Sequence, residues 1–207
     1  WTNIGGIVSF DVHDGTAYMV DHASGQVLTW RLGDAAPQQL AGFVNPAWIS
    51  NSEAIRRAEA LSSTHEMNEF DSVRFGLPQS IVATPNGELL VVDQYRMGIW
   101  KLDPGDESVT KVAGLNANTN YHFGGFTGNV GLESVELRSG SPVQITYDEV
   151  RDIYLVGGGY TKGVIFIRGD FSKTCIAHPD VNTEYISQAR FLSDGRLAVV
   201  DVRRNRV

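Results

Sequence analysis

The chain has 207 residues, of which 42% are hydrophobic and 20% charged, the balance of a folded domain with a sizeable core. Its 24 acidic residues outnumber its 17 Lys and Arg, and the formal net charge of −7 disfavours general binding to nucleic-acid phosphates. No apolar run approaches the length of a membrane-spanning helix, and a single cysteine, Cys175, excludes an intrachain disulfide and a zinc site built on cysteines.

A short motif recurs along the chain: a turn residue, an apolar strand and an aspartate. Its copies are residues 15–21, 87–93 and 195–201, with a degraded copy at 151–157. The three full copies end at Asp21, Asp93 and Asp201, whereas the degraded copy ends at Gly157. Further strand patterns precede and follow each copy, so the repeating unit is four short antiparallel strands over about 40 residues. That unit is typical of one blade of a β-propeller.

We expect the chain to be one propeller section interrupted by insertions. The predicted segments are a blade at 5–43, an insertion at 44–74, a blade at 75–114, a loop insertion at 115–131, a blade at 132–178 and a partial blade at 179–207. The first insertion predicts a short helix, because Ser50 and Glu53 form a capping box before a run without Pro or Gly. Such a section has too few blades to close a ring. We expect the remaining blades from sequence outside this stretch or from another chain.

The second unit carries a family resemblance. Its residues 75–81, 85–93, 98–102 and 112–114 resemble an NHL repeat almost end to end. The third unit is similar over residues 141–145 and 153–156, and the first and last units match more loosely. The resemblance implies an all-β fold: an NHL-type β-propeller, incomplete in this chain, with blades of four antiparallel strands and one short helical insertion.

The repeated aspartates and the residues after them have different predicted roles. We interpret Asp21, Asp93 and Asp201 as acceptors for backbone N–H groups in the turn that follows each of them. Side chains just beyond those positions would project on one rim of a propeller. These rim candidates are His22, Tyr95, Arg96, Tyr160, Lys162, Arg203 and Arg204. Aromatic and Arg side chains on one rim are typical of protein-binding hot spots, and the alternative for each residue is a solvated turn.

The sequence therefore predicts a non-enzymatic protein-interaction or scaffold module, which binds a protein partner through the rim candidates and the insertions. We predict no catalytic residue, metal ligand or cofactor, because the histidines are scattered and residues 157–163 lack the order of a phosphate-binding loop. Some lyases with histidine-bound zinc resemble NHL domains, so the first alternative is a metal-dependent propeller lyase or hydrolase. The second alternative is an RNA-binding NHL domain, which the negative charge disfavours.

Overall fold

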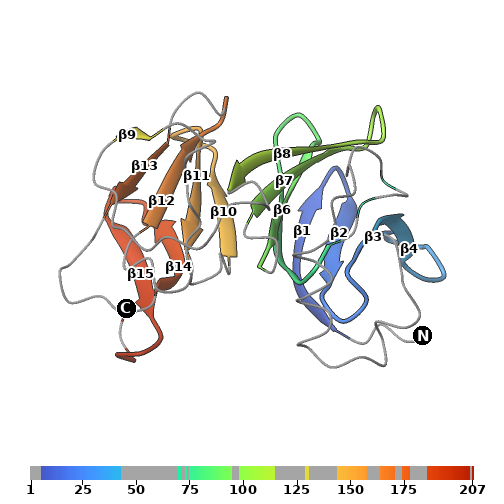
Figure 1. The fold of residues 1–207 in the computed structure, drawn as a ribbon, viewed down its shortest axis with the longest axis horizontal. Helices are drawn as coiled ribbons and strands as arrows, with labels where there is room; N and C mark the ends of the chain where they lie inside the picture. Colours follow the sequence, from blue (N-terminus) through green and yellow to red (C-terminus); the bar gives the residue numbers. More distant parts are fainter. Residues whose placement is uncertain are drawn as a thin grey trace. The chain divides into compact units, whose positions relative to one another are not determined.

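The described part of the chain is built from β-strands alone. The computed structural model describes residues 6–42, 70, 73, 75–94, 98–114, 129–130, 144–157, 164–170, 174–177, 186–205 and 207. These residues form fifteen strands and no helix, so the all-β prediction is confirmed (Figure 1). The helix predicted from Ser50 onward lies outside the described residues. The chain divides into two compact units, residues 1–111 and 112–207.

The first unit begins with an antiparallel meander in the order β1-β2-β3-β4 (Figure 1). Its strands are β1 (Ile7–His13), β2 (Thr16–Asp21), β3 (Gln26–Arg31) and β4 (Gln38–Ala41). A two-residue turn joins β1 to β2, and both Asp14 and Gly15 have positive φ, 46° and 71°. That backbone matches the twist of the flanking strands in a hairpin and fixes the pairing of His13 with Thr16.

A second meander completes the first unit, in the order β5-β6-β7-β8. Its strands are β5 (Pro78–Ala83), β6 (Leu89–Asp93), β7 (Gly98–Asp103) and β8 (Ser108–Gly114). Strand β6 is buried along its whole length, as its continuous apolar run predicts for a strand covered on both faces.

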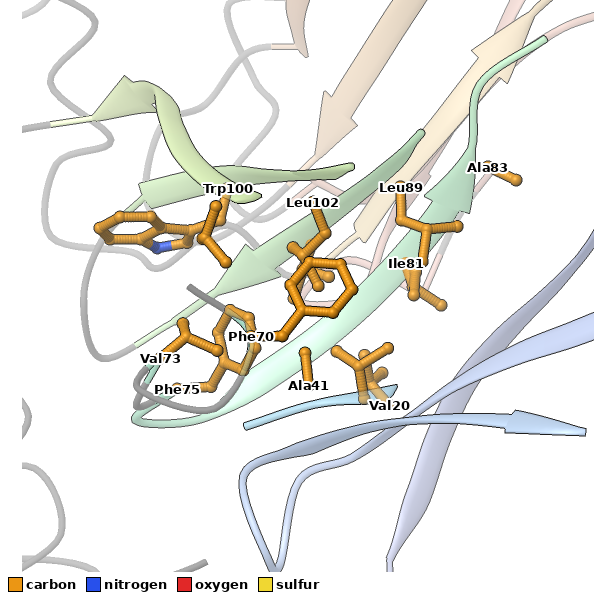
Figure 2. Close-up of a cluster of buried hydrophobic side chains, with 13 residues drawn as sticks. Val20, Ala41, Phe70, Val73, Phe75, Ile81, Ala83, Leu89, Trp100 and Leu102 are labelled. Carbon is orange, nitrogen blue, oxygen red and sulfur yellow. The ribbon is translucent and has the colours of Figure 1, made fainter. Parts of the chain in front are cut away.

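The two meanders of the first unit pack face to face over one hydrophobic cluster. Figure 2 shows Val20 and Ala41 of the first sheet in the same cluster as Ile81 and Leu89 of the second. Phe75, just before β5, is fully buried in it. Strand β1 lies beside β5, so the first strands of the two sheets are neighbours.

The second unit holds two further sheets. Strands β9 (Asn129–Val130), β10 (Gln144–Asp148), β11 (Ile153–Gly157), β12 (Val164–Arg168) and β13 (Thr174–Ala177) form one, in the order β10-β11-β12-β13-β9. Strands β14 (Ile186–Phe191) and β15 (Leu197–Asp201) form a two-stranded sheet. Leu155 and Val164 pack against Ile186 and Ala189 between the two sheets. The described residues thus contain two four-stranded meanders in unit 1 and a four-stranded meander with a short added strand in unit 2.

A β-bulge at one position shows that three of the sheets are copies of one unit, whereas the pairing of β10 with β11 has no such shift. The pairing shifts between Ile7 and Ser9 in β1, between Pro78 and Ser80 in β5, and between Ile186 and Gln188 in β14. In each case the residue before the shift pairs with the aspartate that ends the next strand. Bulges recur as conserved devices of a fold. Positions can therefore be matched between sheets residue by residue.

Tyr147 in β10 gives a pH-dependent prediction. Its hydroxyl donates to Asp152 Oδ1 at 2.7 Å, and its ring lies 4.7 Å from that of Tyr154. Burial, with a smaller contribution from the hydrogen bond to Asp152, raises the pKa of Tyr147 to about 12. In the unfolded state the Tyr147 hydroxyl loses its proton near pH 10. The contribution of the protonated hydroxyl to the stability of the folded state is therefore complete below pH 10 and is lost as the pH rises toward 12. Spectrophotometric titration of the wild type and of Tyr147→Phe should differ by one tyrosine that ionises near pH 12; a difference centred at pH 10 would contradict the prediction.

Candidate functional site

Three buried aspartates stand at the same end of their sheets. Asp21, Asp93 and Asp201 end β2, β6 and β15 and are 3%, 0% and 1% exposed. A carboxylate removed from water in this way requires hydrogen-bond donors, because an uncompensated buried charge is strongly destabilising. The identity of those donors shows what each aspartate organises.

Asp21 holds the turn that follows β2. Its Oδ1 accepts the backbone N–H of Ala23 at 2.9 Å and that of Ser24 at 3.3 Å. The backbone of the same turn is tied at both ends, because Gly25 N donates to Asp21 O and His22 N donates to Gly6 O. The turn that carries His22 is therefore fixed by its backbone, independently of any side-chain contact of His22.

Asp201 holds the corresponding turn after β15. Its Oδ1 accepts the backbone N–H of Arg204 at 3.4 Å, and Asn205 closes the turn with a positive φ of 50°. Arg203 and Arg204 are exposed in this turn, and Val202 beside them is 51% exposed. The turn thus presents two guanidinium groups and an apolar side chain together.

Asp93 has donors that the sequence did not reveal. Its carboxylate accepts the N–H of Gly76 at 2.7 Å and that of Leu77 at 3.0 Å, both from the segment that leads into β5. Gln94 N then donates to Leu77 O at 2.9 Å. The turn predicted to surround Asp93 includes residues 95–97, which lie outside the described residues. In the described part, Asp93 ties the entry of β5 to the exit of β6.

The structure describes only some of the rim candidates. His22 belongs to the first unit, and Arg203 and Arg204 belong to the second. The other candidates lie outside the described residues: Tyr95, Arg96, Tyr160 and Lys162. His22 directly follows Asp21, at the end of the first sheet opposite to the β1–β2 hairpin. Arg203 and Arg204 lie in the turn after Asp201, at the end of their sheet opposite to the β14–β15 hairpin.

The His22 turn holds polar atoms without partners. The matching turn of the second sheet pairs Gln79 Nε2 with Gln94 Oε1 at 3.0 Å. When the two sheets are aligned on their bulges, Val8 stands where the second sheet has Gln79, and His22 stands where it has Gln94. The valine side chain cannot form a hydrogen bond with His22. Accordingly, His22 Nδ1 and Ser24 Oγ are buried and make no hydrogen bond in the described structure. Ser24 was not among the rim candidates; comparing the repeats position by position would have found this turn.

His13 lies at the other end of the first sheet. It ends β1 at the hairpin to β2, with Nε2 3.5 Å from the carboxylate of Asp14. Within the ranges that the structure describes, no three His, Cys, Asp or Glu side chains gather as a metal-binding group. Nor does any helix there have the length and apolar character needed to cross a membrane.

Comparisons with known proteins identify the fold. No protein-family model matches the sequence, and no curated protein sequence matches it. Among solved structures, the chain is similar to virginiamycin B lyase from Staphylococcus aureus, with a TM-score of 0.58 and 12% identity over 97% of this chain and 50% of that one. It is similar to a chain of the nidogen–laminin complex, with a TM-score of 0.58 and 12% identity over 94% of this chain and 56% of that one. A putative gluconolactonase gives a TM-score of 0.54 and 10% identity over 92% and 53%.

These similar structures are six-bladed propeller-like proteins. The chain therefore has a β-propeller fold, with its four-stranded meanders as blades. Identities of 10–12% show the fold and not the activity. The chain spans about half the length of these three structures, and 33% of a further similar protein of unknown function from Bacteroides thetaiotaomicron.

Proposed function

We propose that this chain is a protein-interaction module of the NHL-propeller type, which binds a protein partner through its rim candidates. The NHL assignment rests on the resemblance of residues 75–81 and 85–93 to that repeat. The binding assignment rests on the turns that follow the buried aspartates.

The observation that carries the proposal is the fixed backbone of these turns. Asp21 accepts two backbone N–H groups of the following turn and Asp201 accepts one, so each turn is held by hydrogen bonds before any partner arrives. Preordered loops lose less conformational entropy on binding, which increases affinity. Beyond Asp201 the turn presents Arg203, Arg204 and the exposed Val202. Arginine is enriched in binding hot spots, and an adjacent apolar side chain adds area that binding would bury.

The comparisons are compatible with this function at the level of the fold. One of the similar structures is a propeller within the nidogen–laminin complex, which is a complex between proteins. A propeller of this kind is thus compatible with protein binding, and the same scaffold is available to this chain.

A metal-dependent lyase or hydrolase is the second candidate. Two similar structures are a lyase and a putative lactonase, and a catalytically inactive variant of the lyase carries a histidine-to-alanine replacement. In this chain the buried, unpaired Nδ1 of His22 is the observation that favours such a site. RNA binding is the third candidate, and the net charge of −7 disfavours it.

An enrichment experiment separates these candidates. The 207-residue chain, immobilised, is incubated with extract of the cells that express it, and bound proteins are quantified by mass spectrometry. The proposal predicts a reproducible partner that is lost with Arg203→Ala/Arg204→Ala. The same partner should be retained with Arg196→Ala, a matched arginine at the other end of the same sheet. Equal retention of the partner by the Arg203→Ala/Arg204→Ala and Arg196→Ala variants would contradict the proposal. Stoichiometric zinc or calcium in the purified protein would favour the lyase or hydrolase. A salt-sensitive mobility shift with single-stranded RNA would favour RNA binding.

A further inference from the structure

Among the described residues, one face of the first sheet is apolar and exposed. Phe10 and Val12 alternate with Ser9 and Asp11 along β1, which places them on one side of the sheet, and they are 66% and 57% exposed. Phe10 pairs with Met19 and Val12 with Ala17, so these residues share that side. We call Phe10, Val12, Ala17 and Met19 the open face of the first sheet. The opposite side, which includes Val20, packs on the second sheet.

The contact between the two sheets of the first unit shows how such a face is covered. Ser9 Oγ accepts the N–H of Ile81 at 3.3 Å, and Asp11 Oδ2 accepts the N–H of Ala83 at 2.8 Å. These donors lie on β5, the edge strand of its sheet. Side chains of one first strand therefore accept hydrogen bonds from the edge of the next first strand, while apolar side chains pack behind them.

The open face carries the same donor positions, with one change. The bulge register matches Phe10 with Ile81 and Val12 with Ala83. At the second position, Val12 N already donates to Asp11 Oδ1 at 2.9 Å. A strand that covers this face would therefore meet the backbone N–H of Phe10 and, beside Val12, the Asp11 carboxylate oxygen that accepts the Val12 N–H. The complementary side chains are an acceptor for the first and a cation for the second.

The last sheet of the chain offers those two side chains. Gln188 and Arg190 are exposed on β14, on the side opposite to Ala189 and Phe191, which pack on the preceding sheet. Gln188 pairs with Val200 as Ser9 pairs with Val20, and Arg190 pairs with Ala198 at the position that Asp11 occupies in β1. The two residues therefore stand at the positions from which Ser9 and Asp11 contact the second sheet.

We propose that the open face of the first sheet binds the β14–β15 sheet of a second copy of this chain. Gln188 Oε1 of the second copy accepts the N–H of Phe10, and Arg190 of the second copy pairs with the carboxylate of Asp11. Ala198 and Val200 of the second copy cover Phe10 and Val12. The second copy is chosen as the partner because its Gln188 and Arg190 stand at the positions that complement the Phe10 N–H and the Asp11 carboxylate. This head-to-tail association is independent of the proposed function.

The oligomeric state of the purified chain tests the proposal. Sedimentation equilibrium should give twice the 22.7 kDa of one chain. Phe10→Asp should weaken association by about tenfold or more, because it places a charge in an apolar contact. Leu32→Asp is the matched control, since Leu32 is 90% exposed in a turn of the same sheet and should leave association unchanged.

Arg190→Glu should weaken association, and Arg168→Glu, at an exposed arginine of β12, should not. Circular dichroism confirms that each variant is folded.

A mixture of variants tests the head-to-tail geometry. Phe10→Asp retains an intact β14–β15 sheet, and Arg190→Glu retains an intact open face. Mixing the two should therefore restore one good contact and a dimer, whereas each variant alone stays monomeric. A wild-type monomer at every concentration, a dimer insensitive to Phe10→Asp, or a mixture that stays monomeric would each overturn the proposal.

Discussion

Replacing Asp93 by alanine should lower the free energy of unfolding of the first unit by about 3 kcal/mol or more. The carboxylate is fully buried and accepts the N–H groups of Gly76 and Leu77. Alanine would leave both donors buried and without a partner, and each unsatisfied donor costs about 1–3 kcal/mol. Urea denaturation measures the loss, and hydrogen exchange of the Gly76 and Leu77 amides should accelerate with it.

Two controls make this prediction specific. Asp93→Asn retains one acceptor oxygen and should give an intermediate loss. Asp106→Ala removes an exposed carboxylate whose partner, Ser108 N, water can replace, and should change stability by about 0.5 kcal/mol or less. A loss at Asp93→Ala no larger than that at Asp106→Ala would show that the aspartate does not organise the entry of β5.

Leu89→Ala should lower the free energy of unfolding of the first unit by about 2–5 kcal/mol. Leu89 is fully buried in the cluster of Figure 2, where it lies near Ile81 and the first sheet contributes Val20. Alanine would leave a cavity between two sheets, so protection from hydrogen exchange should fall in β2 as well as in β6. Leu32→Ala, at a 90% exposed turn residue, should change stability by about 0.5 kcal/mol or less. A loss confined to β6 would mean that the two sheets do not stabilise each other.

The fold was predictable because its determinants are local. Alternation of apolar residues marks the strands, the Asp14 and Gly15 turn sets a hairpin register, and the apolar run of β6 marks a strand buried on both faces. The contacts between sheets were not predictable in this way. Ser9 and Asp11 accept N–H groups from residues about 70 positions along the chain, and no local pattern distinguishes them from ordinary solvated polar residues of a strand.

The candidate site was predictable in part for the same reason. Asp21 accepts donors two and three residues away, a local pattern that turn chemistry describes. Asp93 takes its described donors from Gly76 and Leu77, which precede it by 17 and 16 residues, so local turn chemistry does not predict them. The unpaired state of His22 Nδ1 depends on Val8 standing where the second sheet has Gln79, which only an alignment of the two sheets reveals.

Photo-cross-linking from the last sheet tests most directly whether the turns after the buried aspartates bind a protein. A photoreactive residue is placed at Arg203 or Arg204, and in separate proteins at Asp194 or Arg196, in the hairpin at the opposite end of β14–β15. All four positions are exposed. We predict that one cellular protein becomes cross-linked from positions 203 and 204 and not from 194 and 196. Cross-links from the hairpin alone, or equal yields from all four positions, would contradict the account.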